Sequence, residues 1–141
     1  MRVLFICTAN SCRSQMAEAW ARRLFPPGWE AASAGLIRYP ITEETRRAMA
    51  EVGIDMTGQH SKSIDAVDAA AFDLVVTLSE QAGRFLPRLV PPERHLHRPV
   101  PDPMGARGTP QEVAAAFATA RDRIGDVVRE VIRSLGGTPA G

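Results

Sequence analysis

The stretch CTANSCRS, Cys7–Ser14, lies between an apolar run and a helical pattern near the start of the 141-residue chain. The run VLFI before it is long enough for one buried strand, and apolar residues recur after it at four-residue spacing. We therefore expect a strand over Arg2–Ile6, a loop over Cys7–Arg13 and a helix over Ser14–Phe25, with Ser14 where a helix cap would stand. The pattern places a cysteine at a strand-to-helix junction.

This junction has the chemistry of an oxyanion site. Consecutive backbone N–H groups and the positive end of a helix attract a tetrahedral anion, and Arg13 adds a bidentate guanidinium. The same donors favour the nucleophilic thiolate of Cys7, to which Ser14 can donate a hydrogen bond. Asn10 tolerates the left-handed backbone of a tight loop, whereas Ala9 would fit a positive φ less well than glycine. The residues expected to bind the oxyanion are Thr8, Ala9, Asn10, Ser11, Cys12, Arg13 and Ser14.

Strand and helix patterns alternate along the rest of the chain. Phe72–Leu78, FDLVVTL, has the continuous apolar centre of a strand covered on both faces. The other expected elements are a strand over Trp29–Ala34, a helix capped by Thr42 and ending at Gly53, a helical piece around Ile64–Ala70, a helix over Glu80–Leu86 stopped by Pro87, a strand over His95–Arg98 and a helix over Thr109–Leu135.

This alternation predicts an α/β fold, a doubly wound sheet of four parallel strands with helices on both faces. The carboxyl ends of such strands form the binding edge, and Cys7 would lie there. We expect one domain over residues 1–141, with Gly136–Gly141 as a flexible tail. Trp20, at a helical repeat, is expected in the core.

Composition argues against several classes of protein. A net charge of +1 with 45% hydrophobic and 23% charged residues gives no surface suited to nucleic acid or membranes. Two cysteines in one loop fit a reducing cytoplasm, and neither a signal peptide nor an apolar run of about 20 residues is present. We expect a cytoplasmic, soluble monomer with no metal and no bound cofactor. His95 and His97 share a strand face, but no third metal ligand stands near them, so we expect their side chains to face solvent.

Seven segments together resemble the low-molecular-weight protein tyrosine phosphatase superfamily, and within it most of all the thioredoxin-coupled type of arsenate reductase. The resemblance implies a flavodoxin-like three-layer fold, with Cys7 as nucleophile, Arg13 as oxyanion clamp and Asp102 as general acid. An aspartate in a rigid Pro-Asp-Pro loop suits delivery of a proton to a leaving oxygen. The segments are CTANSCRS, SQMAEAWARR after it, SAG at Ser33–Gly35, AMAEVGID at Ala48–Asp55, FDLVVTL at Phe72–Leu78, DP at Asp102 and RDRIG at Arg121–Gly125.

The chain departs from the reductase pattern at two positions. The resemblance leads one to expect two further cysteines after the strand FDLVVTL, and Ser79 and Leu86 stand there instead. Arsenate reduction needs two electrons, which thiols deliver by forming a disulfide. The second sulfur is therefore either Cys12 or an external thiol such as thioredoxin, glutaredoxin, glutathione or mycothiol. Cys12 could equally protect Cys7 from over-oxidation, as the resemblance suggests, or simply pack the loop.

The phosphatases of this superfamily place aromatic side chains around the substrate ring. Here Met104 and Gly105 follow the DP pair, and Tyr39 alone remains as a possible wall. We therefore expect an arsenate reductase of arsenic detoxification, with a tyrosine or small aryl phosphate phosphatase working through phosphocysteine as the alternative. An oxyanion-binding module without turnover is a third class. Lys62 lies where some reductases of this type bind potassium, and its ammonium either replaces that ion or is solvated.

Overall fold

Four parallel strands form a single sheet in the computed structural model, which describes residues 1–141. The strands are β1 (Arg2–Cys7), β2 (Glu30–Gly35), β3 (Leu74–Thr77) and β4 (His95–His97), in the order β2-β1-β3-β4. These are the first four positions of the flavodoxin-like 2-1-3-4-5 order. The expected fold class is therefore confirmed, and each end of a predicted strand lies within two residues of the observed end.

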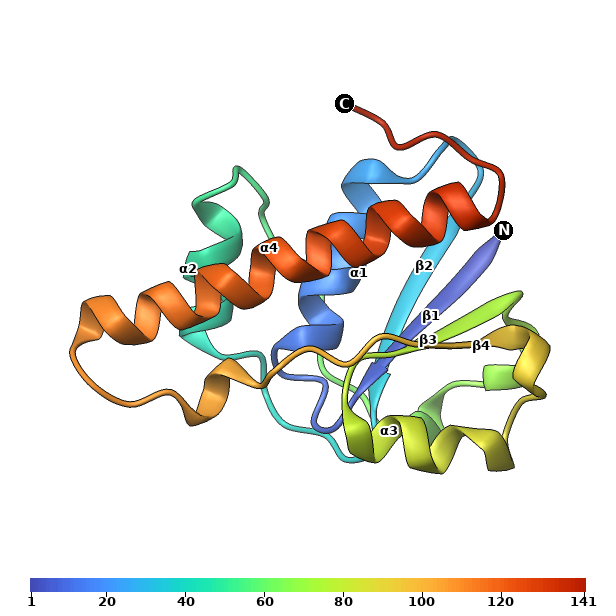
Figure 1. Ribbon diagram of the computed structural model, residues 1–141, viewed down its shortest axis with the longest axis horizontal. Helices are drawn as coiled ribbons and strands as arrows, with labels where there is room; N and C mark the ends of the chain where they lie inside the picture. The colour runs from blue at the N-terminus through green and yellow to red at the C-terminus, as the bar shows by residue number, and fades with distance from the viewer.

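Helices cover both faces of the sheet. Figure 1 shows α1, α2 and α4 on one face and α3 on the other. None of them combines the length and the hydrophobicity that a membrane crossing requires. Their bounds are Arg13–Leu24 for α1, Glu43–Ala50 for α2, Glu80–Phe85 for α3 and Pro110–Ser134 for α4.

The central strand β1 explains why the sheet sequence is so apolar. Val3 and Phe5 belong to the larger core, which α1, α2 and α4 complete, whereas Leu4 and Ile6 belong to a smaller core closed by α3. All four side chains are at most 1% exposed. Successive side chains point to opposite faces of a strand, so a strand with a helix layer on each face has no polar positions. Trp20 lies in the larger core, as predicted.

The start of α1, next to the loop that carries Cys7, differs from the prediction. Helix α1 begins at Arg13, and its N-cap residue Cys12 makes no side-chain capping bond. Ser14 therefore stands inside the first turn and is not the cap that we expected. By contrast, Thr42 caps α2 as predicted, and Thr109 forms a reciprocal capping box with Glu112 at the start of α4. The first turn of α1 is thus left without a side chain occupying its N–H groups.

Two short elements also differ from expectation. The helical piece expected around residues 64–70 is two separate 3-10 turns, Ile64–Ala66 and Ala69–Ala71, because the residues between them have extended backbone. Helix α3 ends at Phe85, one residue before the predicted end, and Pro87 lies in the 3-10 turn over Leu86–Arg88 that follows it. In the tail, the N–H of Ala140 donates to the last turn of α1; the flexibility of this tail stays a prediction.

Gly35, at the end of β2, packs directly on the loop after β1. A Cβ at this position would stand 2.4 Å from the carbonyl oxygen of Ile37 and 2.6 Å from the backbone nitrogen of Asn10. Both are backbone atoms, which cannot rotate away as a side chain can. The close approach of the two segments therefore requires glycine here.

We predict that Gly35→Ala lowers the free energy of unfolding by about 1–3 kcal/mol, because the added methyl group displaces backbone. Urea denaturation measures this change, and the loss of stabilisation by added phosphate reports the distortion of the loop. Gly105→Ala is the matched control, since a Cβ there would meet nothing within 4 Å. Equal shifts in the two variants would contradict the role given to Gly35.

Candidate active site

The carbonyl oxygens at the end of β1 and in the loop that follows it accept hydrogen bonds from a neighbouring segment of backbone. Those of Cys7, Thr8 and Ala9 accept hydrogen bonds of 3.0 to 3.2 Å from backbone N–H groups of the segment after β2. No backbone N–H of Thr8–Cys12 is among the donors within the protein. Buried N–H groups require partners, so this loop and the uncapped first turn of α1 form a cradle for an anion. The donors to the three carbonyls are Leu36, Ile37 and Tyr39.

Ser14 connects the cradle to the sulfur of Cys7. The hydroxyl oxygen of Ser14 lies 2.9 Å from Cys7 Sγ and accepts a 2.7 Å hydrogen bond from Asn10 Nδ2. Because the oxygen accepts from Asn10, its hydrogen is free to point at the sulfur. A hydrogen bond donated to sulfur favours the thiolate, which is the nucleophilic form. Asn10 is the one non-glycine residue with positive φ, at 53°, so it is Asn10 and not Ala9 that takes the left-handed conformation.

A chain of hydrogen-bonded side-chain amides holds the side chain of Asn10 in one orientation. Its Oδ1 accepts from Gln15 Nε2 at 2.8 Å and from the backbone N–H of Lys62 at 2.9 Å. Gln59 Nε2 in turn donates to Gln15 Oε1 at 2.9 Å. We did not predict Gln15 or Gln59 as site residues. The sequence offered only one indication, which is that Gln15 stands next to the apolar face of a predicted helix. Together they determine which way the Asn10 amide, and therefore the Ser14 hydrogen, points.

Arg13 joins the cradle to the Pro-Asp-Pro segment. Its Nη1 donates to the carbonyl of Val100 at 2.9 Å, and its Nη2 lies 3.5 Å from Asp102 Oδ2. The other carboxylate oxygen, Oδ1, accepts from the N–H of Met104 at 3.0 Å, so Asp102 is held with Oδ2 toward Arg13. Of the three residues predicted to be catalytic, Arg13 and Asp102 thus lie in direct contact, and both, like Cys7, lie close enough to Cys12 for their charges to act on it.

A cleft of about 610 Å³, here called the Arg13 cleft, opens beside Arg13 and Asp102, and Thr8, which follows Cys7, also lines it. No aromatic residue lines it, and Tyr39, whose side chain points largely into solvent, is not part of it. Ser79, one of the two positions of the missing cysteines, lies beside the cleft with its hydroxyl 3.1 Å from Thr8 Oγ1. The cleft is lined by Thr8, Arg13, Glu80, Gln81, Pro99, Val100, Pro101, Asp102 and Arg123.

Cys12 is a free, buried thiol beneath the cradle. Burial raises the pKa of Cys12 to about 12, and the nearby charges of Cys7 and Asp102 act in the same direction. A hydrogen bond with Thr45 and the charge of Arg13 oppose this pKa rise. Cys12 is therefore in the thiol form near neutral pH.

Lys62 packs beside a buried carboxylate under the loop. Its Nζ donates to the carbonyl of His60 at 3.1 Å and lies 3.9 Å from Glu18 Oε1. Glu18 also accepts from Ser33 Oγ at 2.7 Å and pairs with Arg22 at 2.6 Å. The solvated alternative for Lys62 is therefore wrong, because its side chain is only 20% exposed. Whether its ammonium replaces a potassium ion stays a prediction.

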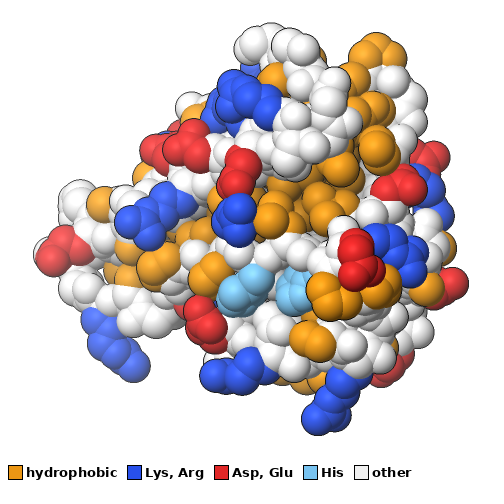
Figure 2. Space-filling model, turned by 45° about the vertical axis from the view of Figure 1, so that its right-hand side comes forward, with side chains coloured by type: hydrophobic (Ala, Val, Ile, Leu, Met, Phe, Trp, Pro, Cys, Tyr) orange, Lys and Arg blue, Asp and Glu red, His pale blue; other side chains and the backbone are white.

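The two histidines of β4 share one hydroxyl. Thr77 Oγ1 lies 2.8 Å from His95 Nε2 and 2.6 Å from His97 Nδ1, and two adjacent histidines are visible at the surface in Figure 2. A hydroxyl donates only one hydrogen, so at most one of the two rings accepts from Thr77 and at least one ring donates to it. Both histidines are partly exposed, as expected, and each ring also has a protein partner in Thr77. No group of three or more His, Cys, Asp or Glu is placed to hold a metal.

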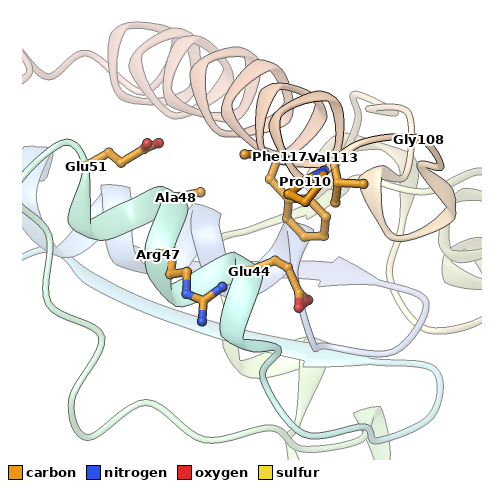
Figure 3. Close-up of a pocket in the computed structure, with 9 residues that line it drawn as sticks. Glu44, Arg47, Ala48, Glu51, Gly108, Pro110, Val113 and Phe117 are labelled. Atoms are coloured by element: carbon orange, nitrogen blue, oxygen red, sulfur yellow. The ribbon is translucent and has the colours of Figure 1, made fainter.

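A second hollow, of about 400 Å³, lies between α2 and α4 (Figure 3). Ala48, Val113 and Phe117 provide apolar surface, with Glu44 and Arg47 among its charged residues. None of the predicted site residues lines it, and it shares no residue with the Arg13 cleft. The chemistry of the chain is therefore concentrated at the carboxyl end of β1 and not in this hollow.

Comparison with known proteins identifies relatives of the whole chain. Residues 2–138 match the family model described as low molecular weight phosphotyrosine protein phosphatase. An arsenate reductase of Bacillus subtilis (strain 168) is 41% identical over 128 residues, which cover 91% of this chain and 92% of that protein. A solved structure of an arsenate reductase in the phosphate-binding state is 31% identical, with a TM-score of 0.83 over 96% of this chain and 98% of that one. A low molecular weight protein tyrosine phosphatase from T. tengcongensis is 26% identical, with a TM-score of 0.79 over 95% and 99%.

We predict that Ser14→Ala slows alkylation of Cys7 by iodoacetamide at pH 7 roughly tenfold, because the sulfur loses a hydrogen bond worth at least about 1.5 kcal/mol to a charged acceptor. The rate is followed by mass spectrometry of the peptide that contains Cys7. Ser11→Ala is the control, since Ser11 lies in the same loop and its side chain makes no bond to the sulfur. An unchanged alkylation rate in Ser14→Ala would remove Ser14 from this role.

Proposed function

Because the chain belongs to the low-molecular-weight phosphotyrosine protein phosphatase family, we propose that it is an arsenate reductase in which Cys7 attacks arsenate and an external thiol supplies the second sulfur. Relatives named arsenate reductase, 38–41% identical over nine-tenths of the chain, support this choice. The cradle of N–H groups and Arg13 suits any tetrahedral oxyanion. The choice between arsenate and an aryl phosphate therefore depends on what surrounds the cradle.

The observation that carries the proposal is the absence of aromatic side chains from the Arg13 cleft. A phenyl ring gains much of its binding free energy from aromatic neighbours, and Tyr39 lies outside the cleft. Besides Arg13, the cleft is lined by three charged residues, Glu80, Asp102 and Arg123. Such walls suit small, polar reactants.

The reaction requires one condensation of Cys7 with arsenate, followed by two attacks of external thiols on sulfur. The Cys7 thiolate bonds to arsenic, and one arsenate oxygen leaves as water after protonation, for which Asp102 is the placed acid. An external thiolate then attacks the Cys7 sulfur; an S–S bond forms, the S–As bond breaks, and arsenic departs with the electron pair as arsenite. A second thiol resolves the mixed disulfide, so arsenic acid and two thiols give arsenous acid, one disulfide and one water.

The state of Cys12 supports an external second sulfur. Attack on Cys7 requires a thiolate, and burial keeps Cys12 protonated with a pKa of about 12. Ser79 lies beside the cleft and carries a hydroxyl, which cannot form a disulfide. The chain therefore holds no second thiol that is both ionised and close to the cradle.

Hydrolysis of aryl phosphates is the second candidate function. The position of Asp102, with Oδ2 toward Arg13, favours it, because a phosphocysteine intermediate at Cys7 also needs a proton donor for the leaving oxygen. The family description and the relative from T. tengcongensis point the same way. One cradle can serve both reactions, since each begins with attack by Cys7 on a tetrahedral centre.

We expect Cys7→Ser to abolish arsenate-dependent thiol consumption and Cys12→Ser to keep at least about a tenth of it, because only Cys7 bonds to arsenic. Arsenite release and thiol loss are measured with thioredoxin, glutaredoxin, glutathione and mycothiol offered separately. Loss of turnover in Cys12→Ser with every donor would make Cys12 the second sulfur. No turnover of the unaltered protein with any donor would reject the reductase.

We predict that Asp102→Asn slows hydrolysis of p-nitrophenyl phosphate roughly 10²- to 10⁴-fold while the affinity for inorganic phosphate changes little, because an amide cannot donate the proton. Asp126→Asn is the control, since Asp126 is an exposed aspartate of α4 that does not line the cleft. The turnover number and phosphate inhibition separate catalysis from binding. Similar losses of rate in the two variants would count against Asp102 as the acid.

A further inference from the structure

The Arg13 cleft is larger than an oxyanion needs. Arsenate has five heavy atoms, whereas the cleft of about 610 Å³ falls in the range that holds whole small organic ligands. The cradle takes the oxyanion at one end, against Arg13. The remaining space is therefore available to a second reactant of small-molecule size.

Two charged side chains in this space have no part in the chemistry at Cys7. Arg123 comes from α4 and Glu80 from the start of α3, so they approach the cleft from helices on opposite faces of the sheet. The neighbouring arginines of α4, Arg121 and Arg129, form ion pairs, whereas Arg123 has no such partner. The side chain of Glu80 is 64% exposed, and its carboxylate lies 3.6 Å from the ring nitrogen Nε2 of His97.

We propose that Arg123 and Glu80 bind the carboxylate and the ammonium group of a small zwitterionic thiol, the second substrate of the reductase. The inference rests on the proposed function, because only a reductase needs that thiol. The bound thiol attacks the sulfur of the Cys7–arsenic adduct in the step given above. A second molecule of the same thiol then attacks the mixed disulfide and releases Cys7. Thiols of the cysteine and glutathione type carry both charged groups.

The shape of the surface near Arg123 supports a small thiol with an extended body. Arg123 also lines an adjoining hollow of about 530 Å³ along α4, which shares Val100, Pro101 and Asp102 with the cleft. Ala116 and Ala120 of α4 contribute apolar surface there. A guanidinium at the border of the two spaces can pair with a carboxylate while the thiol end extends to Cys7. A sugar-based thiol without a carboxylate would leave Arg123 unpaired.

The test compares thiols that differ in charge. In arsenate turnover by the intact protein, Arg123→Gln should raise KM about three- to fivefold for glutathione and 3-mercaptopropionate, the size expected for a partly exposed ion pair. KM for 2-mercaptoethanol should stay unchanged, and 0.5 M KCl should abolish the difference. Glu80→Gln should instead raise KM for cysteamine. Arg123→Lys, which keeps the charge, should restore part of the affinity for glutathione.

Arg133→Gln is the matched control, because Arg133 is an exposed arginine of the same helix outside the cleft. Equal KM changes for charged and neutral thiols, or none in Arg123→Gln, would overturn the inference while the reductase itself stands. Turnover with thioredoxin alone would likewise overturn it, in favour of a protein thiol. Failure of every donor would reject the reductase itself, and arsenate inhibition of aryl phosphate hydrolysis would then show that the cradle is intact.

Discussion

The side-chain amide of Asn10 is the contact on which the active-site loop depends. Its nitrogen donates to Ser14, and its oxygen accepts from Gln15 and from the backbone of Lys62. The same residue carries the left-handed backbone of the loop, with φ at 53°. One residue therefore sets both the path of the chain and the direction of the hydrogen bond to Cys7. A glycine there would keep the backbone path and lose the side-chain contacts.

Arg13 makes the second connection, between segments almost ninety residues apart in sequence. Through the carbonyl of Val100 and the carboxylate of Asp102 it holds the Pro-Asp-Pro segment over the loop. The parallel sheet makes this possible, because it brings the carboxyl ends of β1 and β3 to one edge, and β4 leads into the segment that carries Asp102. Cys7 and Asp102, the proposed nucleophile and acid, thus come from separate crossovers of one fold.

The proposed reductase and the phosphatase alternative share the cradle and differ in what completes the reaction. Water and a proton complete hydrolysis, whereas reduction needs a second sulfur that the chain does not present as a thiolate. Burial holds Cys12 in the thiol form, and Ser79 occupies a position beside the cleft where a cysteine would have served. In the proposed reductase, the second sulfur would therefore come from a molecule outside the chain.

Local patterns in the sequence were sufficient to predict the four strands, the main helices and the parallel sheet. They also predicted the strand-to-helix junction that carries Cys7 and Arg13. These features are local because strand and helix periodicity and turn chemistry act over a few residues. Asp102 needed a family resemblance, since an aspartate between prolines is otherwise an ordinary turn residue. Only the tertiary structure decided that Ser14 faces the sulfur, that Gln59 supports Asn10, that Tyr39 lies outside the cleft and that Arg123 lies inside it. Such contacts join elements distant in sequence, and packing of the helices on the sheet decides them.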